Sequence, residues 1–149
     1  MNFVAPDVLY SYDQSTTGYE LSRIQLLPGG AIFVNKTNPF SGFGTEIRAD
    51  SSRLYSSNGV AAELDGSRAG TFSISGFGWN VHPDWSRGRV LFLNGATLSA
   101  FTASSFALQG SITVSPAATA GRFELWGKDG IAYRTSTQVI LVRSPLIGG

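Results

Sequence analysis

The residues of this 149-residue chain that could form a nucleophilic centre lie close together, at His82, Asp84 and Ser86. A histidine can take a proton from a serine hydroxyl while a carboxylate holds the imidazole in place. The sequence has no Gly-x-Ser-x-Gly segment, however, and Pro83 favours an extended or turn conformation at His82. We therefore expect His82 to be a loop or strand-end residue without a catalytic role, and we predict that the chain is not an enzyme.

Four aspartates recur at corresponding positions before predicted strands, which raises the question of a metal site: Asp7, Asp50, Asp84 and Asp129. Aspartate at such positions usually accepts hydrogen bonds from backbone N–H groups of a turn. His82 is the single histidine, cysteine is absent, and no calcium-loop or phosphate-loop motif occurs. The pattern favours turn capping, and we expect neither a metal nor another cofactor.

The three tryptophans are the candidates for ligand binding, because an exposed indole can stack on a sugar ring. Trp85 lies in a predicted polar loop beside His82 and Arg87, which makes it the strongest candidate. Trp79 and Trp126 lie in or beside predicted first strands, where a large ring more often fills space between sheets. The candidate ligand site therefore comprises Trp85, His82 and Arg87, with Trp79 and Trp126 as further members.

The charge of the chain excludes several classes of partner. Lys and Arg number 11, Asp and Glu number 10, and charged residues make up 14% of the sequence. A nucleic-acid binder would need a basic face, and so would a polybasic membrane-surface protein. No apolar run is long enough for membrane insertion, and the first residues lack the features of a signal peptide. We expect an extracellular or cell-surface protein whose leader is not present in this chain.

Short alternating runs rich in Val, Ile, Phe, Tyr and Thr predict β-strands, and helical periodicity is nearly absent. Asn58-Gly59 and Asn94-Gly95 each separate two such runs, which is a strong signal for a hairpin. The tetrapeptide Ser-Gly-Phe-Gly occurs at 41–44 and again at 75–78. The chain is therefore predicted to be all-β and repetitive.

An internal alignment divides the predicted single all-β domain 1–149 into four repeat units, at about 1–44, 45–78, 79–121 and 122–149. Each unit has a second strand with a central aromatic residue, and Tyr55, Phe92 and Tyr133 are predicted to be buried. Fourth strands are predicted at 31–35, 70–74 and 107–114, whereas the last unit lacks one. This pattern predicts four-stranded antiparallel blades of the β-propeller type, about 3.5–4 per chain, with a β-sandwich or jelly roll as the alternative.

The segments 94–114, 122–135 and 139–143 resemble the YVTN-like β-propeller repeats of bacterial surface proteins. The resemblance covers nearly the whole chain, and the chain is similar to the C-terminal part of a larger propeller. It implies a non-enzymatic binding or structural module of an extracellular or cell-surface protein. A carbohydrate-binding, lectin-like propeller and a virion surface or decoration protein are the alternatives.

The expected partner is a second copy of the chain, because three or four blades are too few to close a ring. The end blades would then expose apolar faces, and the strand predicted at 138–143 would have an unpaired edge. A homodimer would complete the ring. A glycan or another surface protein is a further expected partner, whereas nucleic acid is not.

Overall fold

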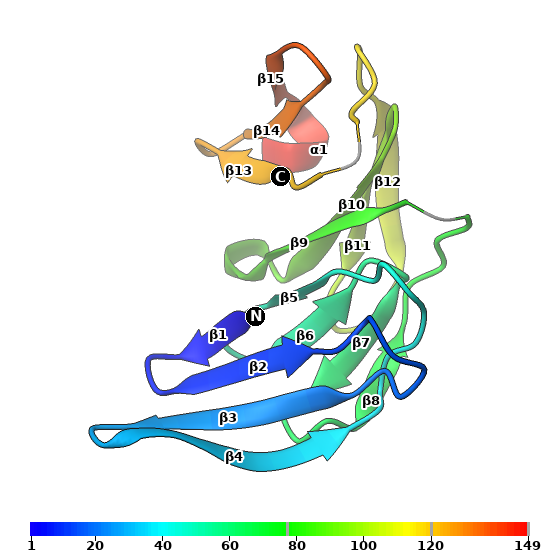
Figure 1. The fold of residues 1–149 in the computed structure, drawn as a ribbon. Helices are drawn as coiled ribbons and strands as arrows, with labels where there is room; N and C mark the ends of the chain where they lie inside the picture. The colour runs from blue at the N-terminus through cyan, green and yellow to red at the C-terminus, as the bar shows by residue number, and fades with distance from the viewer. Residues whose placement is uncertain (77, 120, 149) are drawn as a thin grey trace. The chain divides into compact units, whose positions relative to one another are not determined.

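A computed structural model describes residues 1–76, 78–119 and 121–148 of the chain. Phe77, which belongs to the second Ser-Gly-Phe-Gly segment, lies outside the described residues. The chain forms two compact units, Met1–Thr71 and Phe72–Gly149, and each is described by itself. Figure 1 shows that both units are built from small sheets whose consecutive strands lie side by side.

The first unit contains two four-stranded antiparallel sheets in the described part of the chain. The strands of its first sheet are β1 (Asn2–Ala5), β2 (Val8–Tyr12), β3 (Leu21–Leu27) and β4 (Gly30–Thr37). The strands of its second sheet are β5 (Ile47–Ala49), β6 (Arg53–Ser56), β7 (Val60–Glu63) and β8 (Arg68–Thr71).

The second unit contains a four-stranded sheet, a three-stranded sheet and two short helices. The four-stranded sheet consists of β9 (Asn80–Asp84), β10 (Arg89–Asn94), β11 (Thr97–Thr102) and β12 (Leu108–Thr113). The three-stranded sheet consists of β13 (Glu124–Trp126), β14 (Gly130–Arg134) and β15 (Val139–Arg143). The helices are the 3-10 helix η1 (Trp85–Arg87) and the α-helix α1 (Pro145–Gly148).

Every one of these sheets joins strands in the order in which they follow along the chain. A Greek-key sandwich would instead pair strands that are distant in sequence. The prediction of antiparallel, propeller-type blades is therefore confirmed, including the shorter last blade. At the Asn94-Gly95 hairpin, Asn94 pairs with Thr97, and Gly95 adopts a positive φ of 53°.

One predicted strand is wrong in its bounds. The strand predicted at 70–74 is β8, which ends at Thr71. Phe72 instead packs into the second unit, where its ring contacts those of Phe92, Phe101 and Phe106 at centroid distances of 5.0–5.5 Å. The alternation of apolar residues in the sequence makes the predicted strand continue through Phe72. In the structure the strand ends before Phe72, whose ring packs with aromatic residues of the second unit.

Alternation along the strands places one face of each sheet in a core. Tyr10 and Leu21 of the first sheet cluster with Leu54 and Ala62 of the second sheet. In the second unit, residues such as Leu91 and Leu98 cluster with Ile131 and Tyr133 of the last sheet. The predicted burial of Tyr55, Phe92 and Tyr133 is confirmed, because each side chain is nearly inaccessible to solvent.

Candidate functional site

The segment from Asp84 to Gly88, called the Trp85 loop below, connects β9 to β10 through the helix η1. Gly88 closes η1 in the left-handed conformation, at φ 60° and ψ 36°, and its N–H donates to the carbonyl of Trp85 at 3.1 Å. The carbonyl of Gly88 in turn accepts from the N–H of Ala103 at 2.9 Å. The backbone of the loop is therefore held at its C-terminal end.

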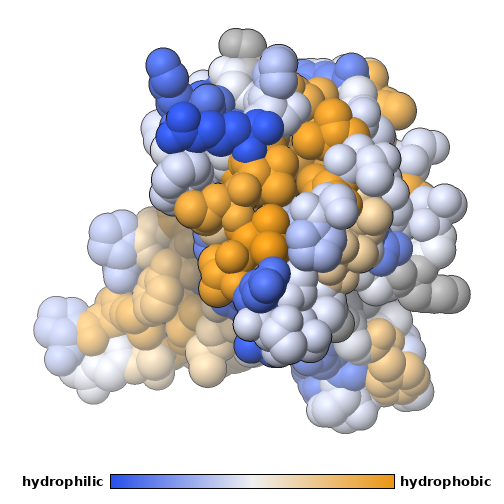
Figure 2. Space-filling view, turned by 90° about the horizontal axis from the view of Figure 1, so that it is seen from above, coloured by the Kyte–Doolittle hydropathy of each residue, from blue (hydrophilic) through white to orange (hydrophobic). Residues whose placement is uncertain are grey.

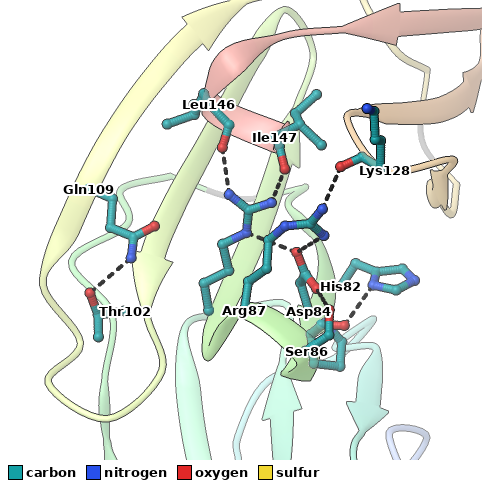
Figure 3. A network of polar contacts seen from close by, with 11 residues as sticks. His82, Asp84, Ser86, Arg87, Thr102, Gln109, Lys128, Leu146 and Ile147 are labelled. Carbon is teal, nitrogen blue, oxygen red and sulfur yellow. Dashed lines mark hydrogen bonds and ion pairs between the residues drawn. The ribbon is translucent and has the colours of Figure 1, made fainter. Parts of the chain in front are cut away.

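The carboxylate of Asp84 holds the loop from its N-terminal end. It accepts hydrogen bonds from the hydroxyl of Ser86 at 2.8 Å and from Nε of Arg89 at 2.9 Å. Nη1 of Arg87 donates a longer hydrogen bond, of 3.3 Å, to the same carboxylate. Figure 3 shows Ser86 and Arg87 turned toward Asp84. Three side chains thus converge on one buried carboxylate.

This convergence lowers the pKa of Asp84. Desolvation by burial, taken alone, would raise the pKa because it disfavours the charged form. The hydrogen bonds from Ser86 and Arg89 and the positive charges of Arg89 and Arg87 together outweigh it, so the pKa lies below its usual value of 3.8. Asp84 is therefore an ionised structural group rather than a proton donor near neutral pH.

Arg89 joins the Trp85 loop to the C-terminal helix. Its side chain is only 4% exposed, and that of Asp84 is 2% exposed. Besides Asp84, its guanidinium donates to the carbonyl of Leu146 at 2.6 Å and to the carbonyl of Ile147. Ile147 is itself buried in the core of the second unit. One arginine therefore couples the loop to a segment that ends the described chain.

Trp85 is exposed on this tied loop, with 74% of its surface accessible, and Ser86, Arg87 and Gly88 are exposed as well. Arg87, two residues further along η1, donates to the carbonyl of Lys128 in the turn between β13 and β14 (Figure 3). Trp85 and Arg87 therefore belong to the same short helix, two positions apart. The arrangement offers an apolar ring on a fixed backbone next to a partly exposed cation.

His82 lies beside a carboxylate from a different sheet. Its Nε2 lies 3.0 Å from Oε2 of Glu124 on β13, and its Nδ1 lies 2.9 Å from the carbonyl oxygen of Pro83. The ring also contacts Phe123, at a centroid distance of 5.7 Å. A doubly protonated imidazole can donate to both oxygens, whereas a neutral one can donate to only one of them. His82 thus lies at the centre of β9 and is paired with a carboxylate, whereas the sequence predicted a loop or strand-end residue.

The other two tryptophans are held by their own contacts. Trp79 donates from Nε1 to the carbonyl of Ser75 at 2.9 Å, and its ring edge packs on Phe92. Trp126 ends β13, and the guanidinium of Arg143 lies 4.8 Å from its ring centroid. No contact described in the structure joins either ring to Trp85. The five predicted site residues therefore do not form one cluster.

Sequence reasoning missed two residues of this region, Glu124 and Arg89. Glu124 lies 42 positions from His82, so no local spacing connects them. Arg89 directly follows the loop. An arginine at the start of an apolar strand, shortly after an aspartate, is the one signal in the sequence that could have indicated an ion pair.

Within the described residues, no group of three or more His, Asp or Glu side chains could hold a metal ion. Across the same residues, no helix is long and apolar enough to span a membrane.

Comparisons with known proteins find similarity in structure but not in sequence. No family model matches the chain, and no curated protein matches it in sequence. The crystal structure of Myxococcus xanthus glutaminyl cyclase is similar to this chain with a TM-score of 0.55 and 20% sequence identity. The similarity covers 93% of this chain but 62% of the cyclase chain. At this identity it supports the fold and leaves the YVTN-like resemblance a prediction.

This similarity corrects one expectation. The chain was predicted not to be an enzyme because its sequence lacks a coherent catalytic motif, but the solved structure that it resembles is an enzyme. The absence of short motifs does not exclude an enzyme, because residues that act together can come from separate sheets of such a fold. The chain is an all-β protein built from propeller-type blades.

Proposed function

We propose that the chain is a carbohydrate-binding module in which the Trp85 loop forms the sugar platform. The observation that carries this proposal is the 74% exposure of Trp85 on a loop held by the buried Asp84–Arg89 pair. A large apolar ring in water gains free energy when a ligand covers it. Because the backbone beneath it is already ordered, binding loses little conformational entropy.

The chemistry around Trp85 fits a sugar better than a purely apolar ligand. The C–H face of a pyranose can pack on an indole, while its hydroxyls need hydrogen-bond partners. Arg87 lies two positions away, and its side chain is 31% exposed with its guanidinium oriented by Asp84 and Lys128. An oriented donor next to an apolar platform is typical of polar-ligand sites.

An extracellular or cell-surface location belongs to the same proposal. Glycans are abundant there, and the resemblance of 94–114, 122–135 and 139–143 to repeats of bacterial surface proteins supports that location. The platform then serves as the contact between the parent protein and a surface polysaccharide or glycoprotein.

A glycan array followed by titration calorimetry tests the proposal. We expect at least one array glycan to bind, Trp85→Ala to weaken its affinity at least tenfold, and Trp85→Phe to weaken it less. The matched control is Trp126→Ala, which removes another exposed indole outside the loop. Equal affinity of the wild type and Trp85→Ala, or binding to no glycan, would contradict the proposal.

A second candidate function is acid–base catalysis by His82 and Glu124. It is favoured by the similarity to an enzyme and by the 3.0 Å contact between Nε2 of His82 and Oε2 of Glu124. A glutaminyl substrate that cyclises forms a bond from its amine to its side-chain amide carbon and releases ammonia. The amine must lose a proton and the leaving nitrogen must gain one, which a paired imidazole and carboxylate can perform.

Release of ammonia from a peptide with N-terminal glutamine tests this second candidate. We expect turnover by the wild type and a loss of about a hundredfold or more in both His82→Ala and Glu124→Gln, the usual range for a general acid–base group. Glu63→Gln, which changes a carboxylate of the first unit, is the control. Absence of ammonia release by the wild type would contradict a glutaminyl substrate.

A further inference from the structure

Exposed apolar side chains occur both on strands and on connections of this chain. Val139 and Leu141 are exposed on β15, and Figure 2 looks onto that end of the second unit, where apolar side chains gather with hydrophilic ones at the margin. Phe43 is 64% exposed and lies instead on the connection between β4 and β5. It belongs to the first of the two Ser-Gly-Phe-Gly segments, at 41–44. The sequence repeat therefore carries an exposed ring outside the sheets.

The two Ser-Gly-Phe-Gly segments share one backbone conformation at their glycines. Gly42 and Gly44 have φ angles of 97° and 71°, and Gly76 and Gly78 have φ angles of 84° and 83°. A residue with a side chain is strained in this region, whereas glycine adopts it readily. The glycines therefore define a repeated turn, and in the first segment they flank the exposed Phe43.

Each segment is closed by the side chain of the residue that follows it. In the first segment the hydroxyl of Thr45 donates to the carbonyl of Ser41 at 3.0 Å. In the second, Nε1 of Trp79 donates to the carbonyl of Ser75 at 2.9 Å. The same closure, over four positions, is thus made by two different donors.

The asparagine of the next Asn-Gly turn lies against each segment. Nδ2 of Asn58 donates to the carbonyl of Ser41 at 2.6 Å in the first unit. In the second unit, Oδ1 of Asn94 lies 3.8 Å from where a Cβ of Gly78 would be. The two repeated motifs of the sequence therefore meet in both units. The segment that carries Phe43 is held from within and by the turn between β6 and β7.

Tyr19 and Phe43 form an aromatic pair, called the aromatic corner below. Their ring centroids are 5.3 Å apart, and the ring planes meet at 68°. Tyr19 adopts a φ of 47°, which is unusual for a bulky side chain. Nδ2 of Asn38 holds this connection by donating to the carbonyl of Gly18. Backbone strain that the surroundings maintain is concentrated at binding and catalytic sites.

Tyr12 and Asp13 place polar groups beside the aromatic corner. The hydroxyl of Tyr12 donates to the carbonyl of Gly42 at 3.4 Å, and its ring packs edge-on against the buried Phe40 at a centroid distance of 5.9 Å. Burial raises the pKa of Tyr12, and the nearby Tyr19 and Asp13 raise it further. The polar ends of these three side chains therefore lie near one another.

Asp13 is ionised in this position, and the groups that bind it are neutral. Its carboxylate accepts hydrogen bonds from the hydroxyl of Ser15 at 2.7 Å, from the N–H of Ser15 at 2.8 Å and from the hydroxyl of Thr16 at 3.0 Å. These hydrogen bonds lower the pKa of Asp13 below its usual value of 3.8. Lys36 is paired with Glu20 at 2.5 Å. The aromatic corner therefore lies beside a carboxylate that keeps its negative charge.

We propose that the aromatic corner binds a small organic ammonium ion, which packs against the rings of Phe43 and Tyr19 while Asp13 supplies the opposite charge. The face of an aromatic ring attracts a cation, and quaternary ammonium groups are recognised in this way. A carboxylate close to the rings adds attraction that a neutral apolar ligand would not receive. Because both connections are already held by hydrogen bonds, binding loses little conformational entropy.

Titration with choline, followed by the NMR signals of residues 13–19 and 41–45, tests this proposal. We expect saturable shifts of these signals. The matched ligand is 3,3-dimethylbutan-1-ol, which has the shape of choline without its charge. It should bind about two- to fivefold more weakly, the size of an exposed cation–π contact.

Phe43→Ala should weaken choline binding by about two- to fivefold, and Tyr19→Leu should change it in the same direction. Asp13→Asn should also weaken binding, and the difference from the wild type should shrink at high salt because exposed charges are screened. Phe33→Ala removes a similarly exposed ring of the first unit and is the matched control. Trp85→Ala should bind choline like the wild type, which separates this site from the proposed sugar platform.

Three results would overturn the proposal. The first is a wild type whose signals do not shift with choline. The second is equal affinity for choline and for its neutral analogue, which would show an apolar site without preference for a cation. The third is a folded Phe43→Ala protein that binds choline as tightly as the wild type.

Discussion

Arg89 and Asp84 form a buried ion pair in which Nε lies 2.9 Å from Oδ2, and both side chains are almost fully enclosed. The remaining donors of Arg89 reach the carbonyls of Leu146 and Ile147. A buried charge is tolerated when it is paired and its donors are satisfied. The pair therefore links the Trp85 loop, the start of β10 and the C-terminal helix.

Removal of Arg89 should strongly destabilise the protein. Arg89→Met leaves Asp84 buried without its main partner, which typically costs about 3–5 kcal/mol. Chemical denaturation followed by tryptophan fluorescence measures the change. Arg143→Met, which removes the more exposed 3.5 Å pair with Asp129, is the control and should cost under about 1 kcal/mol. Equal small effects in both variants would contradict the structural importance of the pair.

Acid should weaken the fold partly through Asp84. Its pKa in the folded state is below the usual value of 3.8, so ionised Asp84 favours the folded state at pH above that value. This contribution falls as pH drops below the usual value toward the depressed one. We expect the free energy of unfolding to fall less between about pH 5 and pH 2 in Asp84→Asn than in the wild type. Asp13 and Asp65 also have lowered pKa values, and they remain in both proteins. An equal pH dependence of the free energy of unfolding in both proteins would argue against a lowered pKa of Asp84.

Trp85→Ala should leave stability almost unchanged, because its ring is largely exposed and makes little packing contact. Surface substitutions of this kind usually change the free energy of unfolding by less than about 0.5 kcal/mol. Acrylamide quenching should be weaker in the variant than in the wild type, because Trp85 is 74% exposed whereas Trp126 is 38% exposed. A loss of several kcal/mol would mean that the indole packs against the protein and is not a free platform.

Phe92→Ala should be among the costliest single truncations in the second unit. Phe92 is fully buried, and its ring contacts those of Phe72 and Phe101 at 5.1 and 5.6 Å. Removal of a buried aromatic side chain costs about 3–5 kcal/mol. Leu108→Ala, at an exposed position, is the control and should cost far less. A thermal unfolding series on both variants checks the difference.

Local patterns in the sequence were sufficient to predict the antiparallel blades. Alternation of apolar and polar residues, together with turns such as Asn94-Gly95, acts within a few residues and determines strands and hairpins. The same alternation identified Tyr55, Phe92 and Tyr133 as buried, since each lies on the apolar side of a second strand.

Contacts between distant segments were decided only by the tertiary structure. His82 meets Glu124 across 42 positions, and Arg89 meets Leu146 across 57 positions. Phe72 continues an apparent strand in sequence, yet it packs with the aromatic residues of the second unit. Periodicity states which way a side chain points but not which partner it meets, because the partner depends on how separate sheets pack. The strands were therefore readable from the sequence, whereas the ion pairs that hold the Trp85 loop and occupy His82 were determined by packing.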